Sequence, residues 1–561
     1  MLLKYEKKIE DTRFSGLWVF CFLWAVIFVL YLPAARSGME GDFPYWVLST
    51  RESFGDYVNT RSSSVHSLYQ FTEIAMYCIY KLFGLNAWLW HLLQVTLHAV
   101  VCLLLYHLCR TIFTDSRTGY PNITAFAGTF LFCIAPHASE VVVRESCYHY
   151  LQGFIFILAI LTWMVRYLKT GQPKYAWYAG VVYAISIFSL EIFYLTPLYV
   201  LAVAVYYRLV LNYDKKAFRS TLSLFLIPQL LLFCLHLALM RMVWGNGIAH
   251  VGLPKFSDPI IYFNRQIMYL FHIVCLGRYF PEQVKGKIYA LCNSAPVVIA
   301  FYCVVALIGC LVVRYSSRMQ AKSKAVVLFL IMAALAICML IPLDFPGTLY
   351  IIGDRYNYVP FAFISMAFVL MISFIPYRFV AFLVYSIYLL FNLYYTVKTN
   401  VYWHRSASIT RKLLTTVPVE ANKKLLLLNL PTSMRGALMI RTHDPSEFKL
   451  MNNLFYEKNK VTNDVYDVCA YNMIHREDGA HVTVCNDSVV HVTLNQWGSW
   501  WWNGDLGASS YENDQFKMNM TDVGHWYELT LRHPASEYLM LYQVGDQWKV
   551  VDWSKKNVDQ N

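Results

Sequence analysis

The chain has 561 residues, of which 57% are hydrophobic and only 15% are charged, and its mean hydropathy is +0.40. Soluble domains contain roughly 25% charged residues, so water is not the only solvent of this protein. The formal net charge is +12, but the basic residues stand in short clusters between apolar runs. Such clusters are typical of the short loops that set the orientation of a membrane protein. They argue against a continuous basic face that binds nucleic acid.

Apolar segments dominate the first 400 residues. A helix needs about 20 apolar residues to cross a bilayer core of about 30 Å, and about 11 segments reach that length. The segments are residues 15–34, 86–108, 120–136, 149–167, 175–191, 194–211, 220–243, 289–313, 324–343, 357–376 and 378–397. We therefore predict a mainly α, polytopic membrane helix bundle over residues 1–400.

Short basic connections set the orientation of this bundle. Residues 4–13, 166–174, 208–219 and 314–324 carry lysine and arginine, and all four fall on one side when the N-terminus is cytoplasmic. Residues 259–279 contain Arg265 and His272 within an apolar stretch, so we interpret this segment as a re-entrant or interfacial helix. The C-terminus then lies outside, together with outer loops 35–85, 137–148, 244–288 and 344–356.

Residues 401–561 have a different texture, with charged residues and short alternating stretches such as HVTVCNDSVVHVTL. Alternation with period two predicts strands, so we expect a soluble β-rich (α+β) domain. The stretch WHRSASITRKLLTTVP before it is either a helix on the membrane surface or a plain linker helix. Only Cys469 and Cys485 are candidates for a structural disulfide, whereas the other cysteines mostly lie in apolar segments. Four tryptophans, at 497 and 500–502, either stack on an acceptor sugar or belong to the domain core.

The first outer loop contains an acid that is a candidate catalytic base. Asp42 follows the first apolar segment by only a few residues, with Glu40 two positions earlier. A carboxylate at the membrane edge can accept a proton from a hydroxyl nucleophile. The alternative is an ordinary solvated acid in a loop.

Two other outer loops gather charges next to apolar segments. The stretch PHASEVVVRE contains His137, Glu140 and Arg144, and ionisable groups at membrane depth indicate either a functional site or an ion-pair strip that neutralises itself. Arg355 and Tyr356 stand in GDRYNYVPF, where the arginine either grips a phosphate or extends to lipid headgroups. No residue spacing identifies a metal site, so a metal requirement stays open. Motifs for nucleotide hydrolysis, dinucleotide binding and zinc proteolysis are missing from the sequence.

The order of these motifs resembles the GT-C superfamily of membrane glycosyltransferases, especially its protein O-mannosyltransferase-like and bacterial lipid-linked-sugar branches. The resemblance rests on GDFPYW, FGLNAWLWHLLQVTLHAVVCLLLYHL, PHASEVVVRE and GDRYNYVPF, and it covers about 400 residues of the membrane part. The family often has two adjacent acids in the first loop, whereas Gly41 precedes Asp42 here. The tetratricopeptide repeats of its eukaryotic branch are replaced by the β-rich tail.

The resemblance implies an inverting transfer of a sugar from a polyprenyl-phosphate donor to a hydroxyl acceptor, on a protein, glycan or lipid, at the non-cytoplasmic face. It assigns catalytic roles to Asp42 and Glu140. It assigns substrate and phosphate binding to five residues: Arg355, Arg144, Arg265, His137 and Tyr356. Arginines or a divalent metal ion would absorb the charge that develops on the leaving phosphate. We expect the bilayer as a partner, no nucleic acid and a location in a bacterial plasma (inner) membrane; the alternative function is a transporter or flippase of lipid-linked sugars.

Overall fold

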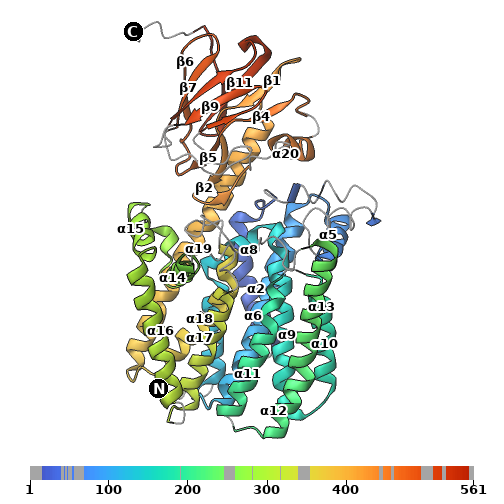
Figure 1. Ribbon diagram of the computed structural model, residues 1–561, viewed down its shortest axis with the longest axis vertical. Helices are drawn as coiled ribbons and strands as arrows, with labels where there is room; N and C mark the ends of the chain where they lie inside the picture. The colour runs from blue at the N-terminus through green and yellow to red at the C-terminus, as the bar shows by residue number, and fades with distance from the viewer. Residues whose placement is uncertain are drawn as a thin grey trace.

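The computed structural model describes residues 16–39, 43–44, 47, 54–55, 68–189, 191–210, 212–245, 259–280, 282–315, 318–338, 354–440, 447–456, 460–494, 510–520 and 526–554. A bundle of long helices forms one part, and a β-rich domain is stacked on one end of that bundle (Figure 1). We call that end the domain-side end and the other one the opposite end.

The bundle consists of helices that run roughly along one direction (Figure 1). They are α2 (Gly16–Tyr31), α6 (Ala87–Asp115), α7 (Pro121–Cys133), α9 (Tyr148–Thr170), α10 (Lys174–Ser186), α11 (Thr196–Val210), α12 (Lys215–Thr221), α13 (Ile227–Trp244), α16 (Ala295–Tyr315), α17 (Ala321–Cys338), α18 (Asp354–Ile372) and α19 (Arg378–Thr415). Within the described residues, nine helices are long and apolar enough to cross a membrane, and the bent pair Pro121–Cys133 and Pro136–Val143 makes up to ten. The chain is therefore a multi-pass membrane protein.

The predicted span at 175–191 forms only the 13-residue helix α10, which is too short for a full span by that measure. The chain between the end of α9 and Phe188, which contains α10, nevertheless returns from one end of the bundle to the other. Asp115 at the end of α6 accepts hydrogen bonds from Lys169 of α9 and Tyr207 of α11, each at 2.7 Å, so these three helices end together. Before α11 begins, the carbonyl of Phe188 accepts from the N–H of Phe71 in α5 (Gln70–Phe83), at the domain-side end. The count of eleven membrane crossings stays a prediction.

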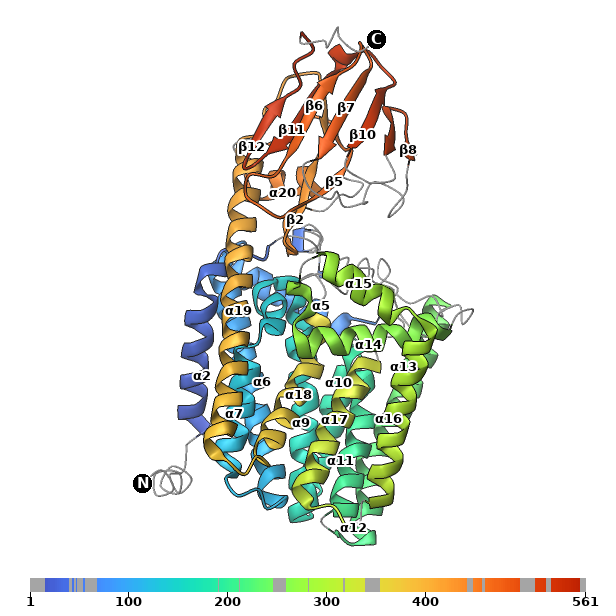
Figure 2. The same cartoon turned by 90° about the vertical axis from the view of Figure 1, so that its left-hand side faces the viewer.

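Helices α14 (Pro259–Cys275) and α15 (Glu282–Cys292) lie at the domain-side end (Figure 2). Near the start of α14, the side chain of Asn264 donates to that of Asn293, just before α16. Near its end, the carbonyl of Ile273 accepts from His137 Nε2 at 3.0 Å. Both ends of α14 are thus at the same end of the bundle, which agrees with an interfacial or re-entrant helix in the segment 259–279.

Helix α19 runs without a break over 38 residues, from the opposite end of the bundle into the β-rich domain (Figure 2). The interpretation of its last turns as a helix on the membrane surface is therefore wrong, and the linker helix is correct. The sequence between Lys398 and Thr415 contains no Pro or Gly, so nothing interrupts its hydrogen-bond ladder.

The C-terminal region is β-rich, as predicted. It contains β1 (Lys424–Leu427), β2 (Leu430–Met434), β3 (Ala437–Leu438), β4 (Val465–Asp467), β5 (Ala470–Met473), β6 (Ala480–Val484), β7 (Val489–Leu494), β8 (Ser510–Glu512), β9 (Phe516–Met520), β10 (Trp526–Leu531), β11 (Tyr538–Val544) and β12 (Gln547–Val550), with one helix, α20 (Glu447–Phe455). The strands form a mixed sheet β12-β11-β1-β4, an antiparallel sheet β6-β7-β10-β9-β8 and a small sheet β3-β2-β5.

The burial of the strands follows their sequence pattern. In β7, Val490, Val492 and Leu494 are buried while the residues between them are not, as alternation with period two requires. Strand β1 pairs in parallel with β11 and β4 and is apolar almost throughout, which is typical of a strand covered on both faces. The suggested disulfide is wrong, since Cys469 is buried, Cys485 is exposed and both are free thiols.

The β-rich domain is attached firmly to the last turns of α19. The indole N–H of Trp548 donates to the carbonyl of Leu413 at 2.8 Å. Lys412 forms an ion pair with Asp546 at 2.9 Å, and Arg476 pairs with the same carboxylate at 2.9 Å. The helix thus contacts the hairpin of β11 and β12, and Arg476 connects that hairpin to the segment after β5.

Candidate functional site

The residues of PHASEVVVRE are buried at the domain-side end because the chain bends after α7. Ala135 is extended, with ψ of 138°, since the proline that follows disfavours a helical conformation there. The bend between α7 and the segment Pro136–Val143 is 55°. It places the short helix α8 (Ser139–Val143) and the turn Glu145–Cys147 across the end of the bundle.

Glu140 of α8 is the centre of an ion-pair cluster with two arginines. Its Oε1 accepts from Arg144 Nη1 at 2.8 Å and from Arg355 Nη1 at 2.6 Å, and its Oε2 accepts from the backbone N–H of Arg355 at 3.0 Å. We call Glu140, Arg144 and Arg355 the arginine–glutamate cluster. The Glu140 side chain is 0% exposed, that of Arg144 4% and that of Arg355 19%, so Arg355 is the member that reaches the surface.

The position of Glu140 explains why a carboxylate is stable in this buried place. It receives three N–H donors, one of them from the first turn of α18, where the helix dipole favours negative charge. A buried charge without such partners would cost several kcal/mol. Of the two interpretations that the sequence left open, the geometry favours an ion-pair strip around Glu140, and a catalytic role for Glu140 stays a prediction.

Two more buried acids adjoin the arginines along the chain. Glu145 follows Arg144 and is 1% exposed, and Asp354 precedes Arg355 and is 0% exposed. The five side chains together contain three carboxylates and two guanidinium groups. Among the residues that the structure describes, no group of three or more His, Cys, Asp or Glu side chains is arranged to hold a metal ion.

Arg355 also contacts Tyr356, the next residue in GDRYNYVPF. Its Nη2 donates to the Tyr356 hydroxyl at 3.1 Å, and its guanidinium carbon lies 4.8 Å from the centre of that ring. Tyr150 of α9 packs edge-on against Tyr356, with ring centres 6.2 Å apart. The arginine is thus fixed by a carboxylate on one side and by an aromatic pair on the other.

His137 occupies a different environment from the arginines. Its Nε2 lies 3.0 Å from the carbonyl oxygen of Ile273, and its ring packs on Phe361 with centres 4.9 Å apart. The imidazole is fully buried. This contact joins α14 to the bend after α7. The role of His137 in substrate binding stays a prediction.

The chain after α2 passes directly over α8 and the turn Glu145–Cys147. Gly38 has φ of +102°, and a Cβ at that position would lie 1.8 Å from the carbonyl oxygen of Val143 and 2.7 Å from Glu145 Oε2. Only glycine adopts this conformation without strain and permits this approach. From α6, Gln94 Nε2 donates to the carbonyl of Arg144 at 3.0 Å.

Gly38 and Gln94 were not singled out from the sequence, although each had a signal. Gln94 is a polar residue inside a predicted span, and such residues are usually functional or structural. Gly38 follows the end of the first span, where the chain must turn over the bundle.

Two predicted site residues are outside what the structure describes. Asp42, the predicted catalytic acid, falls between the described residues 39 and 43. For Arg265, the backbone belongs to α14 but the side chain is outside the described part. Of the seven predicted residues, the structure thus brings together Glu140, Arg144, Arg355 and Tyr356.

A comparison of the chain with models of known protein families found no match, and a comparison with curated protein sequences found none either. The site itself is therefore the basis on which a function is inferred.

Proposed function

We propose that the protein is an inverting membrane glycosyltransferase that moves a sugar from a polyprenyl-phosphate donor to a hydroxyl acceptor. The observation that carries the proposal is the arginine–glutamate cluster at the domain-side end, in which Arg355 is held in place and still reaches the surface. A fixed arginine at the edge of a membrane bundle is suited to the phosphate of a lipid-linked substrate.

Arg355 has donors left for such a phosphate. A guanidinium group carries five N–H donors, and the side-chain contacts of Arg355 described above use two of them. Because Glu140 and Tyr356 fix the plane of the group, little side-chain entropy would be lost when a phosphate binds. Arg144 is buried and pairs with the same carboxylate, so Arg355 is not the sole partner of Glu140.

In the proposed reaction, the acceptor hydroxyl attacks the anomeric carbon as the bond to the phosphate oxygen breaks. Asp42 takes the hydroxyl proton, and the configuration at the anomeric carbon inverts. The lipid phosphate leaves with the bonding electron pair, and Arg355 stabilises the charge on it. Each of these steps is assigned to a side chain of the protein, and a divalent metal ion remains the alternative to Arg355 for stabilising the leaving phosphate.

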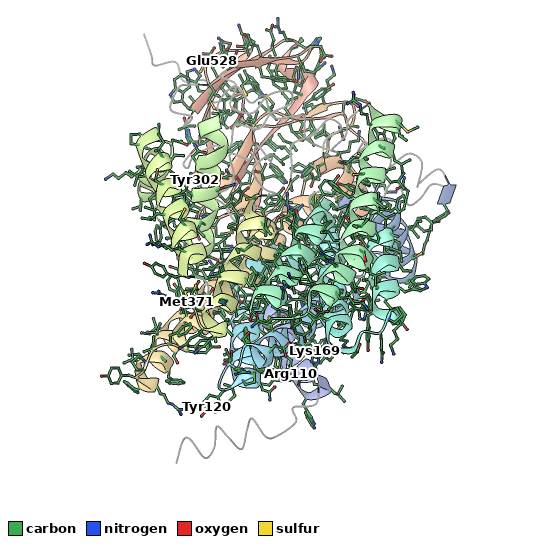
Figure 3. All side chains as sticks on the ribbon, turned by 60° about the horizontal axis from the view of Figure 1, so that its bottom comes forward. Arg110, Tyr120, Lys169, Tyr302, Met371 and Glu528 are labelled. Atoms are coloured by element: carbon green, nitrogen blue, oxygen red, sulfur yellow. The ribbon has the colours of Figure 1, made fainter. Side chains whose placement is uncertain are left out.

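The proposed orientation has the domain-side end outside the cell, with the N-terminus in the cytoplasm of a bacterium. Basic residues favour the cytoplasmic side, and Arg110 and Lys169 lie at the opposite end of the bundle (Figure 3). Lys322 at the same end donates to the carbonyl of Ser373 at 2.8 Å, between α17 and α18. Lipid-linked sugars that are presented outside would then meet the arginine–glutamate cluster.

The second candidate function is a transporter or flippase of lipid-linked sugars. The observation that favours it is that the charges of the cluster are buried within helices of the bundle, as in a translocation pathway. The two functions differ in covalent chemistry, because only the transferase breaks the bond between sugar and phosphate.

The test is transfer of radiolabelled sugar from a panel of polyprenyl-phosphate donors, with purified protein in lipid nanodiscs. We expect Asp42→Asn to abolish transfer and Arg355→Lys to lower kcat/KM by about 10–100-fold, since a charge-assisted hydrogen bond contributes roughly 1.5–3 kcal/mol. Arg378→Lys is the matched control, because Arg378 contacts Tyr120 at the opposite end. Undiminished transfer by both site variants would refute the assignment. Donor movement across vesicles without transfer would establish the flippase instead.

A further inference from the structure

Side chains of neighbouring helices complete the backbone hydrogen bonding at the bend after α7. In a continuous helix, the carbonyls of Cys133 and Ile134 would accept from N–H groups four residues later in the chain, and the bend of 55° breaks that pattern. Nε2 of His98 in α6 lies 3.2 Å from the carbonyl oxygen of Cys133. The hydroxyl of Thr396 in α19 donates to the carbonyl of Ile134 at 2.6 Å. The bend is therefore supported from two other helices.

His98 also forms a hydrogen bond with a third helix. Its Nδ1 lies 2.7 Å from the hydroxyl oxygen of Tyr358 in α18. Because a carbonyl oxygen only accepts, Nε2 carries the ring proton, and Nδ1 accepts from the Tyr358 hydroxyl. The neutral imidazole thus forms a continuous chain of hydrogen bonds from α18 through α6 to the end of α7.

Aromatic packing fixes the orientation of this imidazole. His98 and Tyr358 are both fully buried. The ring centre of Phe132 lies 5.4 Å from that of His98 and 5.1 Å from that of Tyr358, and Phe154 of α9 meets Tyr358 at 5.9 Å. In such a closely packed interior the ring has one orientation, so its two hydrogen bonds define how α18 lies against the end of α7.

The two ends of this chain of hydrogen bonds adjoin the arginine–glutamate cluster. Cys133 is the last residue of α7, and Glu140 lies in α8, directly beyond the bend. Tyr358 is within one turn of Arg355, at the start of α18. The ion pair between Glu140 and Arg355, at 2.6 Å, therefore joins the same two segments that His98 joins.

We propose that His98 is a positioning residue. Through Tyr358 and the carbonyl of Cys133 it sets α18 against the bent segment, and so it holds Arg355 in place on Glu140. The link to sugar transfer rests on the proposed function, whereas the link to the ion pair does not. Without the imidazole, α18 and the bend are no longer joined at this point, so the ion pair contributes less to stability and Arg355 is less well aligned with a phosphate.

The first test is a double-mutant cycle in thermal unfolding of the purified protein in nanodiscs. Substitutions at sites without shared partners have additive effects on stability, and coupled sites depart from additivity. We expect the Tm loss of His98→Ala/Glu140→Gln to be smaller than the sum of the two single losses by about 2 °C or more. The control cycle pairs His107→Ala with Glu140→Gln. His107 is a half-buried histidine of the same helix, next to Gly16 of α2, so its Tm loss should add to that of Glu140→Gln.

The second test uses the transfer assay and separates positioning from stability. His98→Ala should lower kcat/KM for the donor by about tenfold in the wild-type background. In the Arg355→Lys background it should lower kcat/KM by no more than about twofold, because the residue through which it acts is already altered. A purely structural role of His98 would lower kcat/KM by the same factor in both backgrounds.

Additive Tm losses in the His98 cycle would overturn the proposal, and so would an equal departure from additivity in the His107 cycle. An equal fall in kcat/KM in both Arg355 backgrounds would overturn the link to the phosphate site. If wild-type protein transfers no sugar from any donor, the proposed function fails, and the Tm cycle alone decides the role of His98. Should His98→Ala not fold, Tyr358→Phe, which removes only a hydroxyl, replaces it in both cycles and must show coupling of the same sign.

Discussion

Replacing Glu140 by glutamine is the most direct test of the arginine–glutamate cluster. The substitution keeps the shape of the side chain but removes the charge that Arg144 and Arg355 share. Both guanidinium groups then lose this carboxylate as a partner. The introduced amide oxygen would accept only as a neutral group, so each of the three hydrogen bonds to the carboxylate is weakened or lost.

The expected loss of stability follows from the burial of the partners. Removing one member of a buried ion pair typically costs about 3–5 kcal/mol, because the charge of the other member is no longer compensated by it. Arg144 is 4% exposed and retains the full effect, whereas Arg355 is 19% exposed and is partly solvated. We therefore expect the lower end, about 3 kcal/mol, which corresponds to roughly 6–12 °C in Tm for a large domain.

The measurement is thermal unfolding of the purified protein in nanodiscs, followed by tryptophan fluorescence. Asp115→Asn is the control, since Asp115 pairs with the partly exposed Lys169 and the asparagine oxygen can still accept from Tyr207, so the variant should lose only about 1 kcal/mol. The double variant Glu140→Gln/Arg144→Met removes one of the two guanidinium charges and should recover part of the lost Tm. A Tm for Glu140→Gln equal to that of the control, or a double variant less stable than the single one, would show that the cluster is not held by charge.

Three further predictions concern other parts of the chain. Gly38→Ala should lower stability by at least about 2 kcal/mol, measured as a fall in Tm, because φ of +102° and the contact at 1.8 Å exclude a Cβ; an unchanged Tm would contradict this. Hydrogen bonds from Lys412 and Arg476 lower the pKa of Asp546 below its ordinary value of 3.8. Its stabilisation is therefore present above about pH 4 and lost as the pH falls through the lowered pKa. Wild type and Asp546→Asn should differ in Tm at pH 7 and converge as the pH falls through that pKa, and parallel profiles would oppose it. Burial raises the pKa of the Cys469 thiol to about 12, so maleimide should label the exposed Cys485 and spare Cys469 in the folded protein; equal labelling of both would be the contrary result.

The sequence alone determined which solvent each part of the chain occupies. Runs of apolar residues report on the membrane locally, and alternation reports on strands, so the helical bundle and the β-rich C-terminal region were predicted and are confirmed. The same sequence patterns did not predict every local feature of the structure. The pattern could not show that α19 leaves the bundle as one unbroken helix, or that Cys469 is buried while Cys485 is exposed.

Only the tertiary structure decided which residues meet. Glu140 and Arg355 are 215 residues apart in the chain, and nothing in either motif indicates that one would neutralise the other. Leu454 joins one buried cluster with Met76 and Trp90 only because α19 carries the C-terminal domain over this end of the bundle. The physical reason is that periodicity and composition depend on the environment of a residue, apolar or aqueous, whereas the identity of its partner depends on how rigid elements pack.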